Sequence, residues 1–196
     1  MKKLVGLTGK TGAGKSTLSA LLKEKGAYII DGDIVARKVL VDNIVLLNTL
    51  KGEFGEEILN PDGTLNRRAL AKVAFSTPEK IEKLNLIMHP AINDLIFAEA
   101  EKAFSDYDVV IVDAAAIIES GFTEKCDYLI VVHAPVEIRK GRIISRDGLT
   151  EADADVRING QKNDEFYLSK ADFVFYNFPP HNNEEQFSQL EKELFN

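Results

Sequence analysis

The segment that most constrains this chain runs from Gly9 to Ser16 and reads GKTGAGKS. It fits the pattern G-x-x-x-x-G-K-[ST] at every fixed position, between an apolar run at 3–8 and a helical pattern at 15–26. Glycine loses the most conformational entropy on folding, so three glycines within six positions need a compensating interaction. Such a loop can turn backbone N–H groups toward one point at the start of a helix, where a phosphate binds. The sequence therefore predicts a nucleoside triphosphate site on a strand–loop–helix unit.

The residue types that close this motif fit phosphate chemistry. Lys15 is expected to reach the β- and γ-phosphates, and the Ser16 hydroxyl is expected to ligate Mg²⁺. The alternative is an ordinary glycine-rich turn capped by Ser16. We set it aside because all fixed positions and both flanking elements agree with the motif.

The remaining apolar segments predict the fold class. Val/Ile-rich runs without alternation suggest parallel strands covered on both faces, and helical segments separate them. The pattern predicts an α/β, doubly wound, parallel five-stranded sheet of the P-loop NTPase type. The expected strands are 3–8, 27–31, 106–115, 126–134 and 171–177, and the expected helices include 15–26, 33–41, 136–146, pieces of 150–169, and 183–195.

A helix-rich insert interrupts this alternation. Residues 43–105 include a turn signal at 60–64, a helix led by Asn66 and a long helix after Pro78. We expect His89–Pro90 to break or kink that helix. Within a single domain of residues 1–196, we expect a helical acceptor-binding lobe at about 56–105 and a lid at about 140–165.

The composition limits which classes of partner and which cellular compartment fit this chain. The 196 residues are 45% hydrophobic and 28% charged, and the net charge of −7 disfavours a nucleic-acid partner. The longest apolar run, 109–118, is too short to span a bilayer and contains an aspartate, and no signal peptide pattern is visible. Cys126 is the single cysteine, which favours the cytoplasm. Nothing in the sequence indicates the oligomeric state.

Two motifs decide between a GTP-dependent switch and a kinase. A switch would carry D-x-x-G after a strand and N-K-x-D for guanine, and neither pattern occurs. The second expected strand instead ends in Asp31-Gly32-Asp33, where ligands bind in open α/β sheets. A carboxylate there can accept the proton of an attacking hydroxyl or hold metal-bound water. We favour Asp33 as the base and Asp31 as its support, with either left open as a helix N-cap.

The helix after Pro135 carries a series of arginines. Arg142 and Arg146 are four residues apart and share a face, Arg139 precedes them, and Arg157 follows an acidic stretch. Guanidinium donors suit a transferring phosphoryl group, and a polar helical flap suits a lid that excludes water. The alternative is a solvated face of Arg–Asp pairs. The phosphate-binding motif favours the lid.

The chain resembles the dephospho-coenzyme A kinase family over nearly its whole length. GLTGKTGAGKST is similar to the family's phosphate-loop segment, and IIDGDIVARKVL to its D-x-D-x-x-A-R segment. LNLIMHPAI (84–92) is similar to its I-x-H-P-x-I motif. Further collinear matches are GEEILNPDGTLNRRALAKVAF, RKGRIISRDGLTEADADVRINGQ in the lid, and ADFVFYN at the final strand.

The resemblance implies ATP-dependent phosphorylation of the ribose 3′-hydroxyl of dephospho-coenzyme A, with Mg²⁺. It implies Asp33, Lys15 and Arg142 as catalytic residues. Asp31, Arg37, His89 and Glu119 would lie on the acceptor side, with the alternative that His89 only caps and kinks a helix. Water-mediated help to the metal at Ser16 would come from Asp33 or Asp113. The implied ATP-binding residues are Gly12, Ala13, Gly14, Lys15, Ser16, Thr17, Arg142, Arg146 and Asn177.

Two segments depart from the family pattern. Lys10 stands where the family usually has a second glycine, so the loop carries an extra cation that either adds a phosphate contact or points outward. The family's D-x-P-L-L-F-E segment reads DAAAIIE at 113–119, without the proline and the bulky aromatic. This second departure bears on the shape of the acceptor pocket and on the identity of the acceptor more than on the ATP chemistry. Two alternatives stay open. They are a nucleoside or nucleotide kinase of the same architecture and a P-loop regulatory protein that binds ATP.

Overall fold

The computed structural model describes residues 2–40 and 43–196. The chain forms two compact units. One combines the chain up to Asp31 with Ala100–Asn196, and we call it the α/β unit. The other is Gly32–Glu99, and we call it the helical unit. The predicted helix over 33–41 extends to Val41, which lies outside the described residues.

The α/β unit is built on a five-stranded sheet in the order β2-β3-β1-β4-β5, with every neighbouring pair parallel. This confirms the predicted fold class. The strands are β1 (Lys3–Gly9), β2 (Tyr28–Asp31), β3 (Val109–Asp113), β4 (Tyr128–His133) and β5 (Phe173–Tyr176). Because all strands run the same way, their carboxyl ends meet at one edge of the sheet, where ligands bind in such folds.

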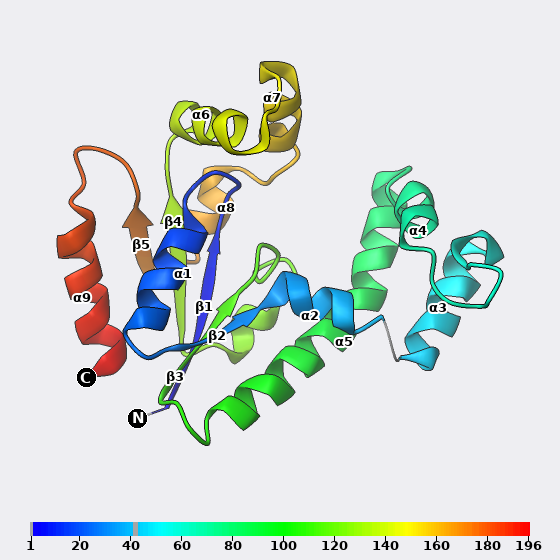
Figure 1. Cartoon of the computed structure of the whole chain (residues 1–196), viewed down its shortest axis with the longest axis horizontal. Coiled ribbons are helices and arrows are strands. Elements are labelled where there is room, and N and C mark those ends of the chain that lie inside the picture. Colours follow the sequence, from blue (N-terminus) through cyan, green and yellow to red (C-terminus); the bar gives the residue numbers. More distant parts are fainter. Residues whose placement is uncertain (1, 41–42) are drawn as a thin grey trace. The chain divides into compact units, whose positions relative to one another are not determined.

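Helices cover this sheet and extend beyond its carboxyl edge (Figure 1). In Figure 1, α6 and α7 lie beyond the carboxyl ends of β1 and β4. The helices of this unit are α1 (Lys15–Glu24), η2 (Phe122–Lys125), α6 (Val136–Asp147), α7 (Glu151–Asn159), α8 (Asp164–Leu168) and α9 (Asn183–Phe195). The predicted lid region thus contains two helices that meet at a sharp turn.

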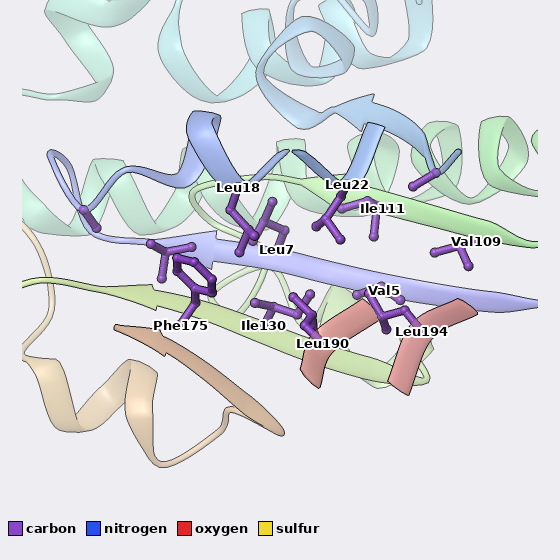
Figure 2. Packing of buried hydrophobic residues seen from close by; sticks show 13 residues of the cluster. Val5, Leu7, Leu18, Leu22, Val109, Ile111, Ile130, Phe175, Leu190 and Leu194 are labelled. Carbon is purple, nitrogen blue, oxygen red and sulfur yellow. The ribbon is translucent and has the colours of Figure 1, made fainter. Parts of the chain in front are cut away.

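The core of the α/β unit explains the continuous apolar runs in its strands. Figure 2 shows Leu18 and Leu22 of α1 on one side of β1 and Leu190 and Leu194 of α9 on the other, packed with strand residues such as Ile130. Strands covered on both faces need apolar residues at successive positions. The core thereby anchors the end of β1, from which the predicted phosphate loop emerges.

The helical unit has a separate core. Its elements are α2 (Gly32–Lys38), α3 (Ile44–Phe54), η1 (Glu56–Ile58), α4 (Arg67–Ala74) and α5 (Pro78–Ala103), whose last residues enter the α/β unit. Asn43 and Asn66 cap α3 and α4 by accepting bonds from Leu46 N and Ala69 N. The helix α5 continues through Pro90, so a break at His89–Pro90 is excluded. Leu50, Ile58 and Ala74 are among the fully buried residues of this core.

One further property follows from the helices of the described chain. None of them, over residues 2–40 and 43–196, combines the length and the apolar character needed to cross a bilayer.

Candidate active site

The predicted phosphate loop leaves the sheet at Gly9 and enters α1 at Lys15. Gly12 and Gly14 have φ values of 79° and 99°, in the left-handed region that side chains disfavour. Gly14 is the N-cap of α1, so the positive end of that helix points into the loop. The Ala13 N–H donates to Lys10 O at 3.0 Å and closes the turn. This is the geometry that the motif predicts for anion binding.

The carbonyl groups of the loop are held from outside by side chains. Arg142 Nη1 donates to Gly12 O at 3.3 Å and to Ala13 O at 3.1 Å. Asn177 Nδ2 donates to Ala13 O at 2.9 Å, and Arg142 Nη2 donates to Asn177 O at 2.8 Å. Since the Ala13 carbonyl is bonded outward, the Gly14 amide of the same peptide is turned the other way, which favours an anion site inside the loop. Arg142 and Asn177 therefore both lie at the loop, while their roles in binding ATP stay predictions.

The start of α1, with one lysine and two hydroxyls, lies beside the carboxyl edge of the sheet. Lys15 forms an ion pair with Asp113, the last residue of β3, and both side chains are mostly buried. Asp31, the last residue of β2, is the register partner of Asp113. Ser16 and Thr17 are exposed in the first turn of α1. The edge thus brings a lysine, two carboxylates and two hydroxyls to the loop.

The donor set at this edge suits Mg²⁺, which prefers oxygen ligands and is usually held by one or two protein groups together with waters and phosphates. Ser16 offers an exposed hydroxyl, and Asp113 offers a carboxylate. No group of three or more His, Cys, Asp or Glu side chains able to hold a metal occurs in the part of the chain described by the structure. The available oxygens fit a metal that binds mainly to nucleotide phosphates.

The acceptor-side candidates belong mostly to the helical unit. Asp33 and Arg37 are exposed on α2, and the sequence runs from the last residue of β2 directly into this helix. The Arg67 guanidinium donates to the Arg37 carbonyl, so α4 contacts α2 there. His89 is half-buried in α5.

Glu119 lies in the α/β unit and accepts a bond from the Tyr167 hydroxyl at 3.2 Å. Burial of Tyr167, followed by the Glu119 charge, raises the pKa of this phenol to about 12. The Tyr167 hydroxyl therefore stays protonated and keeps donating across the physiological range. The bond joins the segment after β3 to α8.

The predicted lid carries its own ion pairs. Arg146 forms a bidentate pair with Asp147 at 2.7 and 2.9 Å, and Arg157 bonds the same carboxylate. The Arg146 bond is the largest cause that lowers the pKa of Asp147 to about 2. Arg146 is 62% exposed in its side chain. Of the two arginines that share a face of α6, Arg142 thus bonds the loop and Arg146 bonds its neighbour.

Two loop contacts were not anticipated from the sequence. The Thr11 N–H donates to Gln161 Oε1 at 2.9 Å, and Arg139 Nη1 donates to Thr11 O at 3.4 Å. Arg139 precedes Arg142 by one helical turn, so its spacing was a usable signal. Gln161 carried no local signal, because only the tertiary structure brings residue 161 to residue 11.

Comparison with known proteins agrees with this geometry. The family model for dephospho-CoA kinase matches residues 3–181. A dephospho-CoA kinase of Corynebacterium jeikeium is 44% identical over 178 residues, covering 88% of this chain and 89% of its own length. One from Listeria monocytogenes serovar 1/2a is 37% identical over 196 residues, covering 100% and 95%. The solved dephospho-CoA kinase of Campylobacter jejuni superposes with a TM-score of 0.71 at 25% identity, covering 99% of this chain and 98% of its own. This chain belongs to the dephospho-CoA kinase family.

Proposed function

We propose that this protein transfers the γ-phosphoryl group of ATP to the ribose 3′-hydroxyl of dephospho-coenzyme A, giving coenzyme A and ADP. The observation that carries the proposal is the loop between β1 and α1, whose left-handed glycines and outward-bonded carbonyls form an anion site, in a chain of this family. We place the enzyme in the cytoplasm, as the single cysteine favours.

The nucleotide side of the reaction rests on the loop. Its amides and Lys15 would bind the β- and γ-phosphates, which requires Lys15 to exchange its ion pair with Asp113 for phosphate oxygens. Ser16 would hold Mg²⁺, with water-mediated help from Asp113 or Asp33. When bound, the metal supplies positive charge to the phosphate oxygens. Arg146 could join the phosphates only by leaving Asp147.

The acceptor side rests on Asp33. In the proposed step the 3′-oxygen forms a bond to the γ-phosphorus, the bond from that phosphorus to the ADP oxygen breaks, and the hydroxyl proton passes to the Asp33 carboxylate. Asp33 is exposed in the first turn of α2, so its carboxylate is accessible to a hydroxyl. Asp31 remains the alternative base.

A groove in the helical unit suits a long acceptor. It has a volume of about 910 Å³, with Leu95 and Val45 in its apolar lining and Lys38 and Asp94 among its charged groups. Ligand sites of this size are typically apolar with a few polar groups. We propose that part of the acceptor lies there and that Arg37 and His89 contact it.

Product analysis tests the proposed reaction. The protein is incubated with MgATP and dephospho-coenzyme A, and the product mass is measured together with ADP release. A product heavier by one phosphoryl group, located at the 3′-position by NMR, is expected. Stimulation by a nucleoside or nucleotide alone would favour a kinase with another acceptor. Slow ADP release that no acceptor stimulates would favour a regulatory ATP-binding protein.

A further inference from the structure

Lys10 replaces a glycine of the family pattern, and its side chain is 89% buried beside the phosphate loop. Its Nζ lies 2.8 Å from Asp164 Oδ1, and 11% of the Lys10 side chain is exposed. Asp164 is the first residue of α8, and the neighbouring Gln161 accepts the Thr11 N–H. Two successive loop residues are therefore bonded to the segment 161–164. This segment lies at the end of the predicted lid, about 140–165.

The same loop also contacts Arg139. This residue of α6 is 1% exposed, donates from Nε to Ala134 O at 3.0 Å, and donates from Nη1 to Thr11 O at 3.4 Å. A Cβ on Gly12 would lie 2.6 Å from the Arg139 carbonyl oxygen, so the two backbones are in direct contact. The Thr11 backbone is thus bonded to Gln161 through its N–H and to Arg139 through its carbonyl.

The buried charge of Arg139 also depends on Asp164. Burial lowers the pKa of Arg139, and the charge of Asp164 opposes that shift. Among the residues described here, Arg139 Nη2 lacks a hydrogen-bond partner, so this guanidinium relies on electrostatic attraction for part of its stabilisation. Desolvation raises the pKa of Asp164, but the bond and charge of Lys10 and the charges of His133 and Arg139 outweigh it. The Asp164 carboxylate therefore stays ionised between two cations.

We propose that Lys10 is a positioning residue whose ion pair with Asp164 holds residues 10–12 against Arg139 and Gln161, so that the loop is shaped for phosphate before nucleotide binds. The inference rests on the proposed function only in that the loop binds a nucleotide phosphate. The opposite possibility is that Lys10 is itself a phosphate ligand. That role would require Lys10 to leave Asp164, and the carboxylate would then lose the partner to which it is bonded.

A double-mutant cycle separates the two roles. We would measure ADP affinity by calorimetry for the wild type, Lys10→Met, Asp164→Asn and the double variant. If the pair acts through loop shape, each single variant weakens ADP binding about three- to tenfold, and the double variant is no weaker than either single variant. Lys10→Arg should bind ADP within about twofold of the wild type, because it can keep the pair.

The matched control is the ion pair between Lys25 and Glu191, which has the same 2.8 Å length but joins the end of α1 to α9. Lys25→Met and Glu191→Gln should leave ADP affinity within about twofold. Steady-state kinetics supply a second readout. The loop variants should raise the KM for ATP and leave the KM for dephospho-coenzyme A unchanged, whereas a general loss of stability would not separate the two constants.

Several outcomes would overturn the proposal. If Lys10→Met weakens ADP binding and Asp164→Asn does not, Lys10 is a phosphate ligand. If the loss of ADP affinity in the double variant equals the product of the two single losses, Lys10 and Asp164 do not act as a pair. The same conclusion follows if neither single variant loses ADP affinity. If a single variant fails to fold, Lys10→Arg is compared with Lys10→Gln, and equal ADP affinity in these two variants would exclude the pair. A wild type that binds ADP but transfers no phosphoryl group would contradict the proposed function alone.

Discussion

The phosphate loop and the helical unit differ in how their functional groups are held. The loop is bonded from three directions, by Arg139 and Arg142 of α6, by Gln161 and by Asn177. In the helical unit, Asp33 and Arg37 are exposed on α2, and apolar side chains such as Val45 are 76% exposed. The loop therefore offers backbone geometry that tolerates little change in shape. The helical unit offers side-chain charge on an accessible surface.

This difference leads to contrasting expectations for substitutions. A change in the loop should act through shape and should affect ATP. A change in the helical unit should act through charge and should affect the acceptor or the transfer step. The predictions below start with the largest expected effect.

Asp33→Asn tests most directly whether the helical unit acts through side-chain charge. The variant should lose about 10²- to 10⁴-fold in kcat, because an amide cannot accept the hydroxyl proton. The Kd for ATP should stay within about twofold, since the substitution leaves the loop intact. Rapid-quench assays and calorimetry measure the two quantities. An unchanged kcat would move the base role to Asp31.

Gly12→Ala tests whether the phosphate loop depends on its backbone shape. Its Cβ would meet the Arg139 carbonyl oxygen at 2.6 Å at a residue with φ of 79°, so either the loop or α6 must shift. We expect ATP affinity to fall roughly 30- to 100-fold, an estimate based on the cost of strain at such positions. The measurement is ATP binding by calorimetry.

Gly26→Ala is the matched control for this substitution. Gly26 has φ of 100°, but nothing lies within 4 Å of its Cβ position. The control should lose about 1 kcal/mol of stability and keep its ATP affinity. Equal losses of ATP affinity in both variants would show that left-handed strain, and not the contact with α6, limits the loop.

Arg37→Ala tests the acceptor assignment in the helical unit. Loss of one charge-assisted bond to the acceptor should raise the KM for dephospho-coenzyme A about 5- to 20-fold with the KM for ATP unchanged. Lys72→Ala removes another exposed cation, on α4, and should change neither constant by more than about twofold. Coupled-assay kinetics with each substrate varied in turn check this. If both variants raise the KM for dephospho-coenzyme A equally, Arg37 acts only through the overall positive charge of the surface and not through a specific contact with the acceptor.

Cys126→Ser should have the smallest functional effect. Cys126 precedes β4, at the end of that strand away from the loop, and its Sγ lies 3.6 Å from Phe122 O. Burial, followed by the Asp127 charge, raises the pKa of this thiol to about 12, so it stays neutral at physiological pH. We expect kcat and both KM values within about twofold of the wild type between pH 7 and pH 9.

The raised pKa of the Cys126 thiol also predicts how the stability of the protein changes with pH. Because the folded-state pKa is raised from its ordinary value of 9.0, the contribution of the neutral thiol is present below pH 9 and is lost as pH rises toward 12. Urea unfolding should therefore show a larger loss of stability from pH 8 to pH 10 in the wild type than in Cys126→Ser. Equal losses would indicate a thiol with an ordinary pKa.

Much of the phosphate site could be predicted because its information is local. The glycines at positions 12 and 14 are required by the left-handed backbone, and the segments flanking the loop carry clear strand and helix patterns. The five strands and their parallel arrangement followed from uninterrupted Val/Ile runs. The resemblance added Asn177 as an ATP-binding residue, a role that stays a prediction, and the structure places its side chain at the loop, bonded to the Ala13 carbonyl. The acceptor roles of Asp33, Arg37 and His89 stay predictions.

The partners of the long charged side chains were decided by the tertiary structure. Lys10 was expected either to contact phosphate or to point outward, and it bonds Asp164 instead. Arg142 and Arg146 share a helix face, yet one bonds loop carbonyls and the other bonds Asp147. The backbone of a loop is specified by residues within it, whereas a flexible cation takes the nearest carboxylate or carbonyl that the fold brings to it. Residues 10 and 164 are far apart in the sequence and are brought together only by the fold of the α/β unit, so no pattern along the chain could pair them.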